Sequence, residues 1–451
     1  MEHNRPVQPR ELANSICSTL QQRGFQALLA GGCVRDILLQ RKPVDYDVAT
    51  DATPDQVLEI FPESIAVGAQ FGVVLVPRHG LKVEVATFRH DVSYTDGRHP
   101  DQITFARTPE EDVSRRDFTI NGLLMRHNTS EILDFVGGQA DLAAALIRAI
   151  GDPTRRFTED KLRMLRGIRF AARFSFQIEP MTFAAIQEHA KEIHVVSAER
   201  IREELTKILT EGHARGGFEL LDESGLLLEL LPEVSRMKGV PQPPEYHPEG
   251  DVWTHTLLLL QGLPADCSTT LAWGVLLHDV GKPPTFQSPA TTGDRIRFNG
   301  HAELGTTIAK EICRRLRFSN DDTEQILSLV VNHMKFKDVS QMKQSTLKKF
   351  VRLPYFQEHL ELHRLDCGAS HGNLDAYNAV RAFIASTPPE QVRPPRLLNG
   401  DDLCEMGYTP GPQFQKMLAT LEDAQLEGAL NTREQAETFI LDHYPLSTTS
   451  R

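Results

Sequence analysis

Two aspartates separated by one residue, Asp45 and Asp47, follow a glycine pair, Gly31 and Gly32, near the start of the chain. Alternate residues of a strand face the same side, so a strand would hold both carboxylates together. Paired carboxylates repel unless a cation lies between them, and Mg²⁺ binds through carboxylates plus the phosphate oxygens of a substrate. Each motif alone is common, and a glycine pair is often only a turn. Together, in this order, they favour a phosphate site.

The glycine pair ends an expected strand over residues 25–29 and opens into Arg35 beside an expected helix start. Free backbone N–H groups at such a turn suit phosphate. The chemistry implied is in-line attack of a 3′-hydroxyl on the α-phosphate of a nucleotide. Two Mg²⁺ ions would activate the hydroxyl and neutralise the pyrophosphate leaving group. Glu84, on a strand that forms a hairpin with residues 73–76, completes the predicted catalytic set of Asp45, Asp47 and Glu84.

Four motifs follow one another over roughly the first 210 residues: GGCVRD with DYD, RRDFTIN at 115–121, EDKLR at 159–163 and ERIREE at 199–204. This series resembles the class II tRNA nucleotidyltransferases, the bacterial CCA-adding enzymes and their poly(A) polymerase relatives. The resemblance implies that these motifs bind metal, handle the nucleotide ribose and phosphates, select the base and stabilise a helical neck. The nucleotide-binding residues so implied are Gly31, Gly32, Arg35, Arg116, Asp117, Asn121, Asp160, Arg163, Arg166 and Arg169.

Base selection by Asp160 and Arg163 has a physical basis. The two residues are three apart, which predicts one shared helix face. A carboxylate accepts from the amino groups of cytosine and adenine, and a guanidinium donates to the neighbouring ring acceptor. UTP and GTP present a carbonyl instead, and an unpaired polar group there costs about 1–3 kcal/mol. The alternative is a surface ion pair.

Four arginines, Arg163, Arg166, Arg169 and Arg173, recur along the same expected helix. On a chain of net charge −12 they are a local basic stripe, which suits contact with RNA phosphates. A solvated helix face remains the alternative.

The polar segment 88–100 contains Gly97 and is predicted to be a mobile loop. In the resembled family a loop at this place is needed to switch from C to A addition, so its presence argues against an enzyme that adds only CC. Residues 67–73 lack the arginine-rich signature expected of bacterial poly(A) polymerases.

Further along, His255, the pair His278-Asp279 and a more distant Asp366 resemble the metal ligands of HD-domain phosphohydrolases. Imidazole and carboxylate together suit Mn²⁺, Fe²⁺, Ni²⁺ or Mg²⁺. The resemblance implies a metal site and a possible phosphoesterase activity, for example on 2′,3′-cyclic phosphates. His301 and His333 are candidates for a second metal or for phosphate binding. A scaffold without activity is the alternative.

The elements that must position these groups suggest an α+β fold. A β-sheet nucleotidyltransferase head with flanking helices is predicted over residues 1–150, and a helical neck over 151–240. Proline-rich breaks at 241–250 and 387–395 then delimit an HD-type helical domain over 241–386 and a helical tRNA-binding tail over 387–451.

Composition agrees with a globular chain of 451 residues, 40% of them hydrophobic and 24% charged. The six cysteines form no CxxC pair, which argues against zinc–thiolate sites and disulfides. No signal peptide or membrane span is expected, and a cytoplasmic location is predicted.

The leading hypothesis is template-independent addition of CCA to the 3′ end of tRNA from CTP and ATP. The alternatives are an enzyme that adds only A to tRNA ending in CC, a poly(A) polymerase, and an HD phosphohydrolase with an inactive head. The sequence does not indicate the oligomeric state.

Overall fold

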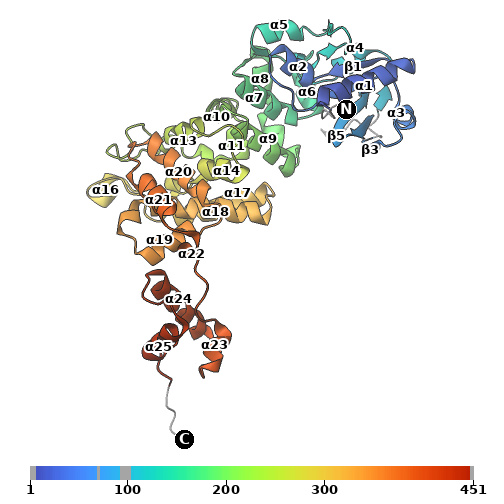
Figure 1. Cartoon of the computed structure of the whole chain (residues 1–451). Helices are drawn as coiled ribbons and strands as arrows, with labels where there is room; N and C mark the ends of the chain where they lie inside the picture. Colours follow the sequence, from blue (N-terminus) through green and yellow to red (C-terminus); the bar gives the residue numbers. More distant parts are fainter. Residues whose placement is uncertain (1–6, 69–71, 92–102, 447–451) are drawn as a thin grey trace. The chain divides into compact units, whose positions relative to one another are not determined.

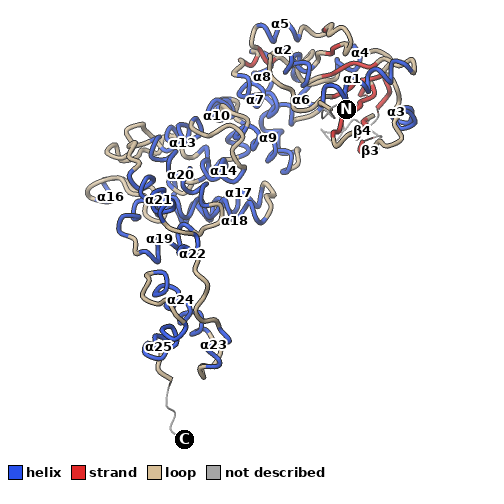
Figure 2. Tube along the Cα trace, viewed as in Figure 1, coloured by secondary structure: helices blue, strands red, loops and turns tan. Residues whose placement is uncertain are grey.

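The computed structural model describes residues 7–68, 72–91 and 103–446 (Figures 1 and 2). The chain divides into two compact units. Unit 1 comprises residues 1–235 with 264–266 and 315–317, and unit 2 comprises the other residues from 236 onward. The predicted α+β head followed by helical regions is confirmed, because strands in Figure 2 are confined to unit 1 among the described residues.

Unit 1 is built on a mixed seven-stranded sheet in the order β3-β4-β5-β2-β1-β8-β9. Strands β2 and β5 run parallel, and every other neighbouring pair is antiparallel. The strands are β1 (Ala27–Ala30), β2 (Asp47–Thr50), β3 (Ile65–Gly68), β4 (Val73–Arg78), β5 (Leu81–Thr87), β8 (Leu124–Met125) and β9 (Ile132–Leu133). The predicted hairpin is β4–β5, closed by His79 and Gly80, which both have positive φ.

The sheet separates two hydrophobic cores because side chains alternate along its central strands. Ala27 and Leu29 of β1 face the first core, whereas Leu28 and Ala30 face the second. The first core packs beneath α1 (Pro9–Gln22), whose apolar side chains recur at helical spacing. Burial on both faces holds β1 and β2 rigid, so the residues at their ends have fixed places.

Short helices and two small strand pairs complete unit 1. Beside the sheet lie α2 (Gly32–Leu38), α3 (Pro54–Ile60), α4 (Pro109–Ser114), the 3₁₀ turn η2 (Thr119–Asn121) and α5 (Gly138–Ala143). The strand pairs are β6 (Arg89–Asp91) with β7 (Ile103–Phe105), and β10 (Leu146–Ile147) with β11 (Gln177–Ile178). The neck helices are α6 (Pro153–Glu159), α7 (Leu162–Phe174), α8 (Pro180–His189), η3 (Ala190–Val195), α9 (Ala198–Thr210), α10 (Ala214–Glu223), α11 (Leu226–Leu230) and α12 (Pro232–Ser235).

Unit 2 is helical throughout its described residues and packs around α14 (Thr269–Leu277), in which Trp273 is fully buried. Its other elements before residue 390 are α13 (Val252–Gln261), α15 (Lys282–Thr285), α16 (Pro289–Thr292), α17 (His301–Arg315), α18 (Asn320–Asn332), η4 (His333–Gln341), α19 (Gln344–Val351), α20 (Phe356–Ala369) and α21 (Asp375–Ser386). The chain then continues through α22 (Pro389–Val392), α23 (Gly400–Glu405), α24 (Pro412–Leu426) and α25 (Arg433–His443), of which the last three enclose a small core of their own.

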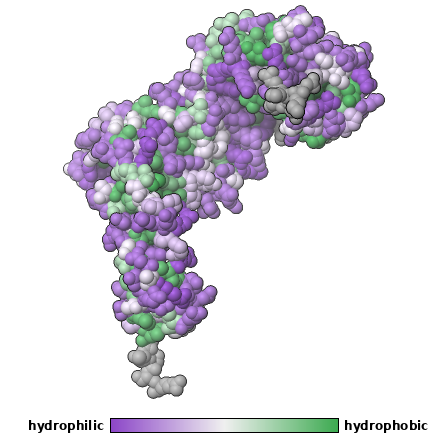
Figure 3. All heavy atoms as spheres, viewed as in Figure 1, coloured by the Kyte–Doolittle hydropathy of each residue, from purple (hydrophilic) through white to green (hydrophobic). Residues whose placement is uncertain are grey.

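Polar side chains cover most of the face shown in Figure 3, with apolar ones scattered among them. No helix within the described ranges has both the length and the apolar character needed to cross a membrane. Residues 92–102, most of the predicted mobile loop, lie outside the described residues, as do 69–71. The four-part division of the chain stays a prediction.

We expect Gly281→Ala to destabilise unit 2, because α17 packs directly against this residue. A Cβ at position 281 would meet the carbonyl oxygen of His301 and lie 2.6 Å from the backbone nitrogen of Gly305. Forcing backbone apart in a packed core costs about 1–3 kcal/mol. Urea unfolding followed by circular dichroism measures the loss. The control is Gly216→Ala in α10, where a Cβ meets nothing within 4 Å. Equal stability of the two variants would contradict the proposed packing.

Candidate active site and metal centre

The sheet register brings three of the predicted elements to one place. Ala30, the last residue of β1, lies opposite Asp47, and Asp47 lies opposite Glu84 of β5. The turn Gly31-Gly32, Asp47 and Glu84 therefore stand side by side across three adjacent strands. Glu84 was predicted only to lie on a neighbouring strand, and the direct pairing makes it the immediate neighbour of Asp47.

Asp45 lies just outside β2, which begins at Asp47, so the prediction that both aspartates belong to the strand is wrong. On the β1 side, β2 has no partner before Asp47, because β1 ends at Ala30 opposite Asp47. Asp45 and Glu84 are exposed and Asp47 is half-buried. Burial, followed by the charges of Glu84 and Asp45, raises the pKa of Asp47 to about 6, although Arg116 opposes the shift. The three carboxylates are thus close enough to repel.

The glycine turn is shaped for close approach by Arg116. Gly31 has φ of 68°, and a Cβ there would lie 3.0 Å from Nη1 of Arg116. Arg116 donates from Nη2 to Asp112 at 2.9 Å and from Nη1 to the backbone oxygen of Asn121 at 3.3 Å. The Gly31 N–H itself donates to the carbonyl of Leu123, so it is not one of the free amides that the sequence suggested. The turn instead offers a guanidinium beside the carboxylates.

A buried polar chain links α2, η2 and α7. Arg35 donates from Nη1 to Oδ1 of Asn121 at 2.6 Å and also pairs with Asp36. Asn121 donates to Oδ1 of Asp117 at 3.0 Å, and Arg166 pairs with Oδ2 of Asp117 at 2.6 Å. We call these residues, Arg35, Asp36, Asn121, Asp117 and Arg166, the head–neck network.

The head–neck network is strongly charge-compensated. Burial alone would raise the pKa of Asp117, but the charge of Arg166 and the bonds from Asn121 and Arg166 hold it well below its usual range. The Arg35 guanidinium lies 5.2 Å from the ring centre of Phe170 and 4.7 Å from that of Phe174. Arg35 is only 4% exposed, so a nucleotide contact there, as predicted, would have to compete with these partners.

Asp160 and Arg163 do not share one helix face, so that expectation is wrong. Helix α6 ends at Glu159 and α7 begins at Leu162, because Asp160 turns out of the helix with φ of −145° and its side chain accepts from the Leu162 N–H. Asp160 pairs instead with Arg200 of α9 at 2.9 Å. Arg163 donates to Glu159 at 2.8 Å and to the carbonyl of Arg115 at 3.0 Å.

The arginine stripe on α7 is neither free nor simply solvated, since each of its members pairs with a carboxylate. Arg169 is buried and lies 2.8 Å from Glu204 and 3.2 Å from Glu211, and Arg173 reaches Glu211 at 3.4 Å. Arg166 pairs with Asp117 and Arg163 with Glu159. Direct nucleotide contacts by Arg166 and Arg169 remain predictions, and Arg169 would first have to leave two partners.

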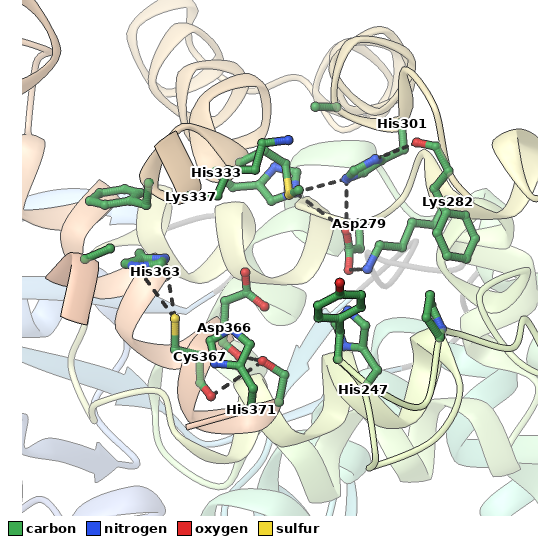
Figure 4. Close-up of a pocket in the computed structure, with 18 of the residues that line it drawn as sticks. His247, Asp279, Lys282, His301, His333, Lys337, His363, Asp366, Cys367 and His371 are labelled. Atoms are coloured by element: carbon green, nitrogen blue, oxygen red, sulfur yellow. Dashed lines mark hydrogen bonds and ion pairs between the residues drawn. The ribbon is translucent and has the colours of Figure 1, made fainter. Parts of the chain in front are cut away.

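In unit 2 the four predicted metal ligands come together from three places in the sequence. His255 Nε2 lies 3.1 Å from Oδ1 of Asp366 and 3.9 Å from Oδ2 of Asp279. His278 Nε2 lies 3.2 Å from that same oxygen of Asp279. On its other oxygen, Asp279 faces His301 at 3.6 Å and His333 at 3.7 Å. Figure 4 shows His301 and Lys282 converging on Asp279.

The donors of this cluster are suited to a cation. The ring nitrogens His255 Nε2 and His278 Nε2 and both oxygens of Asp279 are buried and make no hydrogen bond of good geometry among the described residues. Lys282 Nζ lies 2.6 Å from Oδ2 of Asp279 and supplies a positive charge there. Although burial opposes it, hydrogen bonds to Asp366 and Glu249 raise the pKa of His255 to about 9, whereas burial lowers that of His333 to about 4.

The cluster opens into a cavity of about 1050 Å³. Basic side chains on its wall include Lys282, Arg295, Arg297 and Lys337, and Tyr246 and Phe298 add aromatic surface. Acidic side chains, Asp279, Glu303, Asp366 and Asp375, lie on the same wall, so the cavity offers groups of both charges to a ligand larger than phosphate.

Within the described ranges, every group of at least three His, Cys, Asp or Glu side chains with ligand atoms within 4.8 Å of one another lies in unit 2. The head carboxylates are more widely spaced. Phosphate oxygens of a bound nucleotide would therefore have to complete any metal site formed by Asp45, Asp47 and Glu84.

Sequence reasoning missed four residues that hold predicted ones in place. Asp112 binds both Arg115 and Arg116, and Glu249 binds His255. Lys282 pairs with Asp279, and Arg200, noted only as part of a neck motif, pairs with Asp160. The spacing of Asp112 to Arg115 and Arg116, and of Asp279 to Lys282, three or four residues in each case, carried a signal.

Comparisons with known protein families divide the chain in the same order. The family described as Poly A polymerase head domain matches residues 27–148. The one described as probable RNA and SrmB-binding site of polymerase A matches residues 175–238, and the HD domain family matches residues 252–354. These three matches cover the glycine turn with the carboxylates, much of the neck, and most of the histidine cluster.

Two curated relatives extend over nearly the whole chain. A CCA-adding enzyme of Levilactobacillus brevis is 31% identical over 428 residues, which cover 94% of this chain and 96% of the relative. A CCA-adding enzyme of Limosilactobacillus fermentum is 32% identical over 420 residues, 93% of each chain. The crystal structure of the Bacillus stearothermophilus CCA-adding enzyme in complex with CTP is similar with a TM-score of 0.75 and 26% identity, covering 97% of this chain and 98% of that one.

We expect Asp117→Asn to destabilise unit 1, because it leaves the Arg166 guanidinium without its anionic partner. Removing one partner of a largely buried pair costs about 2–4 kcal/mol, with some relief here from solvent at Arg166. Urea unfolding provides the measurement. The control is Glu63→Gln, which breaks the Arg78–Glu63 pair, in which both side chains are 41% exposed; solvent screens such a pair, so the loss should be much smaller. Similar losses in the two variants would argue against a structural role for the network.

Proposed function

Because this chain belongs to the CCA-adding enzyme family, we propose that its head adds C, C and A to the 3′ end of tRNA at the carboxylates Asp45, Asp47 and Glu84. The activity is template-independent nucleotidyl transfer from CTP and ATP. Relatives of similar length bear this name, and a similar solved structure contains CTP.

The observation that supports the catalytic assignment is the register of β1, β2 and β5. It places Asp47 between the glycine turn and Glu84, with Arg116 above the turn. A triphosphate lying on the turn would meet Arg116 on one side and the carboxylates on the other. Attack by a 3′-hydroxyl on the α-phosphate requires this juxtaposition of positive and negative groups.

The carboxylates fit Mg²⁺, which prefers oxygen ligands and shared phosphate oxygens. Burial, followed by the charges of Glu84 and Asp45, raises the pKa of Asp47, and a bound cation would favour its ionised form. When bound, Mg²⁺ would lower the pKa of the attacking hydroxyl and neutralise charge on pyrophosphate. Asp47 and Glu84 would hold it from adjacent strands, and Asp45 from the exposed segment before β2. Arg116 would bind the triphosphate and keep it in line.

We further propose that Asp160 and Arg163 select the base, although they come from the end of α6 and the start of α7. Arg200 orients the Asp160 carboxylate, and Glu159 with the Arg115 carbonyl orients the Arg163 guanidinium. Fixed side chains reproduce the hydrogen-bonding edge of a template strand more faithfully than mobile ones would.

Asp160→Ala should weaken discrimination against UTP and GTP, because the carboxylate would no longer repel their carbonyl groups. A penalty of about 1–3 kcal/mol corresponds to a roughly 5- to 150-fold fall in the ratio of kcat/KM for CTP to that for UTP. Single-turnover incorporation into a tRNA transcript measures the ratio. Glu188→Ala, at an exposed position on α8, is the control. An unchanged ratio in Asp160→Ala would remove Asp160 from base selection.

A second activity, metal-dependent hydrolysis of a phosphoester, is proposed for unit 2. The supporting observation is the convergence of unbonded histidine nitrogens and Asp279 oxygens beside a cavity whose wall also carries lysine and arginine side chains. Mixed nitrogen and oxygen donors fit Mn²⁺, Ni²⁺, Fe²⁺ or Mg²⁺. His255, His278, Asp279 and Asp366 would hold the metal, and Lys337 and Arg295 lie where they could bind a phosphoryl group. A cytoplasmic location remains a prediction.

The two proposed sites should be separable by mutation. Asp45→Ala should reduce CCA addition at least about 1000-fold, because loss of a metal-binding carboxylate removes the main electrostatic contribution. Transcripts ending at the discriminator base, at C and at CC, incubated with Mg²⁺, CTP and ATP, report this on a sequencing gel. His278→Ala should leave that reaction unchanged and abolish hydrolysis of bis-p-nitrophenyl phosphate with Mn²⁺ or Ni²⁺. Incorporation that persists in Asp45→Ala would refute the catalytic assignment, and hydrolysis that persists in His278→Ala would refute the second site.

A further inference from the structure

Glu249 lies in the segment that leads into α13, and its carboxylate holds two histidines. Oε1 of Glu249 lies 2.7 Å from Nδ1 of His255 and 2.9 Å from Nδ1 of His247. The Glu249 side chain is 7% exposed and that of His255 is fully buried. A nearly buried carboxylate has thus been placed against the one ring nitrogen of His255 that faces away from the metal-ligand cluster.

This contact decides which nitrogen of His255 is available. A neutral imidazole carries its proton on one nitrogen and a lone pair on the other. In the neutral form that binds a metal, donation from Nδ1 to Glu249 leaves the lone pair on Nε2, which points toward Asp366 at 3.1 Å and Asp279 at 3.9 Å. In metal sites such a carboxylate behind a histidine fixes the tautomer and the ring orientation and strengthens the ligand.

We propose that Glu249 is the positioning residue of the unit 2 metal site, acting through His255. The inference rests on the proposed assignment of His255, His278, Asp279 and Asp366 as metal ligands. Glu249 touches neither the metal nor a substrate in this arrangement. Its effect is to present His255 Nε2 with a free lone pair, at a fixed angle, to the space shared with Asp279 and Asp366.

The segment that carries Glu249 is itself anchored, so the carboxylate has a defined place. The Gly239 N–H donates to Oδ2 of Asp251 at 2.6 Å, and the Val252 N–H donates to the carbonyl of Val240 at 3.0 Å. Lys282 donates to Oε1 of Gln242 at 2.7 Å, and the same ammonium group pairs with Asp279. The segment therefore supports two of the proposed ligands, His255 through Glu249 and Asp279 through Gln242 and Lys282.

His247 shares the Glu249 oxygen but is half-buried and precedes α13. His247, Glu249 and His255 are also close enough to hold a cation among themselves, on the Nδ1 side of the His255 ring. The two arrangements predict different contributions of His247 to metal affinity. As a brace for Glu249 it contributes little to metal affinity, whereas as a ligand it contributes as much as His278.

The test is calorimetric titration of the full-length protein with MnCl₂ and with NiCl₂. Glu249→Ala should weaken binding about 10- to 100-fold, the effect typical of outer-shell partners of metal-bound histidines. Glu249→Gln keeps a hydrogen-bond acceptor of the same size, so its loss should be smaller. Glu245→Ala, an exposed glutamate of the same segment, is the matched control and should bind like the unaltered protein. His278→Ala marks the effect of losing a ligand.

Wild-type-like affinity in Glu249→Ala would overturn the inference while leaving the metal site in place. A loss in His247→Ala as large as that in His278→Ala would overturn it as well, by making His247 a ligand. No binding of either metal to the unaltered protein would refute the proposed metal site and, with it, the role of Glu249. If Glu249→Ala does not fold, as judged by its melting temperature, Glu249→Gln decides: weakened binding supports the inference and unchanged binding overturns it.

Discussion

The head–neck network is the interaction on which the architecture of unit 1 depends. Two guanidinium groups and two carboxylates are drawn from α2, η2 and α7, and the Asn121 side chain joins them into one continuous chain. Burying any one of these charges alone would be prohibitive, so each is tolerable only while the others are in place. Because Arg35 lies in α2, which begins at the glycine turn, and Arg166 lies in α7, the network fixes the turn and α7 relative to one another.

The two proposed metal sites differ in how they hold neighbouring carboxylates. The head carboxylates lie on two adjacent strands and just before one of them, partly exposed and spread apart, so a charged nucleotide would complete the site only during each reaction cycle. The unit 2 cluster is preassembled: its histidines and Asp279 are buried and close together, Asp366 is half-buried beside His255, and Lys282 partly neutralises Asp279. Oxygen donors in the first and mixed nitrogen and oxygen donors in the second also separate the cations that each can hold.

Local patterns predicted the parts of this structure that depend on near neighbours in sequence. The helix over residues 9–22 and the β4–β5 hairpin follow from hydrophobic spacing and turn residues. Predictions failed where a distant partner decided the outcome. Asp160 leaves its helix and is held by Arg200, and the arginines of α7 are matched by Glu204 and Glu211 some 35 residues or more away. No periodicity within α7 distinguishes a paired guanidinium from a free one.

Helix α7 has a consequence for how chains of this kind can be recombined. The rings of Phe170 and Phe174 each contact several guanidinium groups. One of these belongs to Arg35, which precedes the predicted head boundary near residue 150. A head transferred without its own α7 would lose the two phenylalanine rings that contact Arg35, and it would lose Arg166, the counter-ion of Asp117. The segment that can be exchanged between proteins is therefore larger than the sheet. A functional chimera must take the head and α7 from the same parent protein.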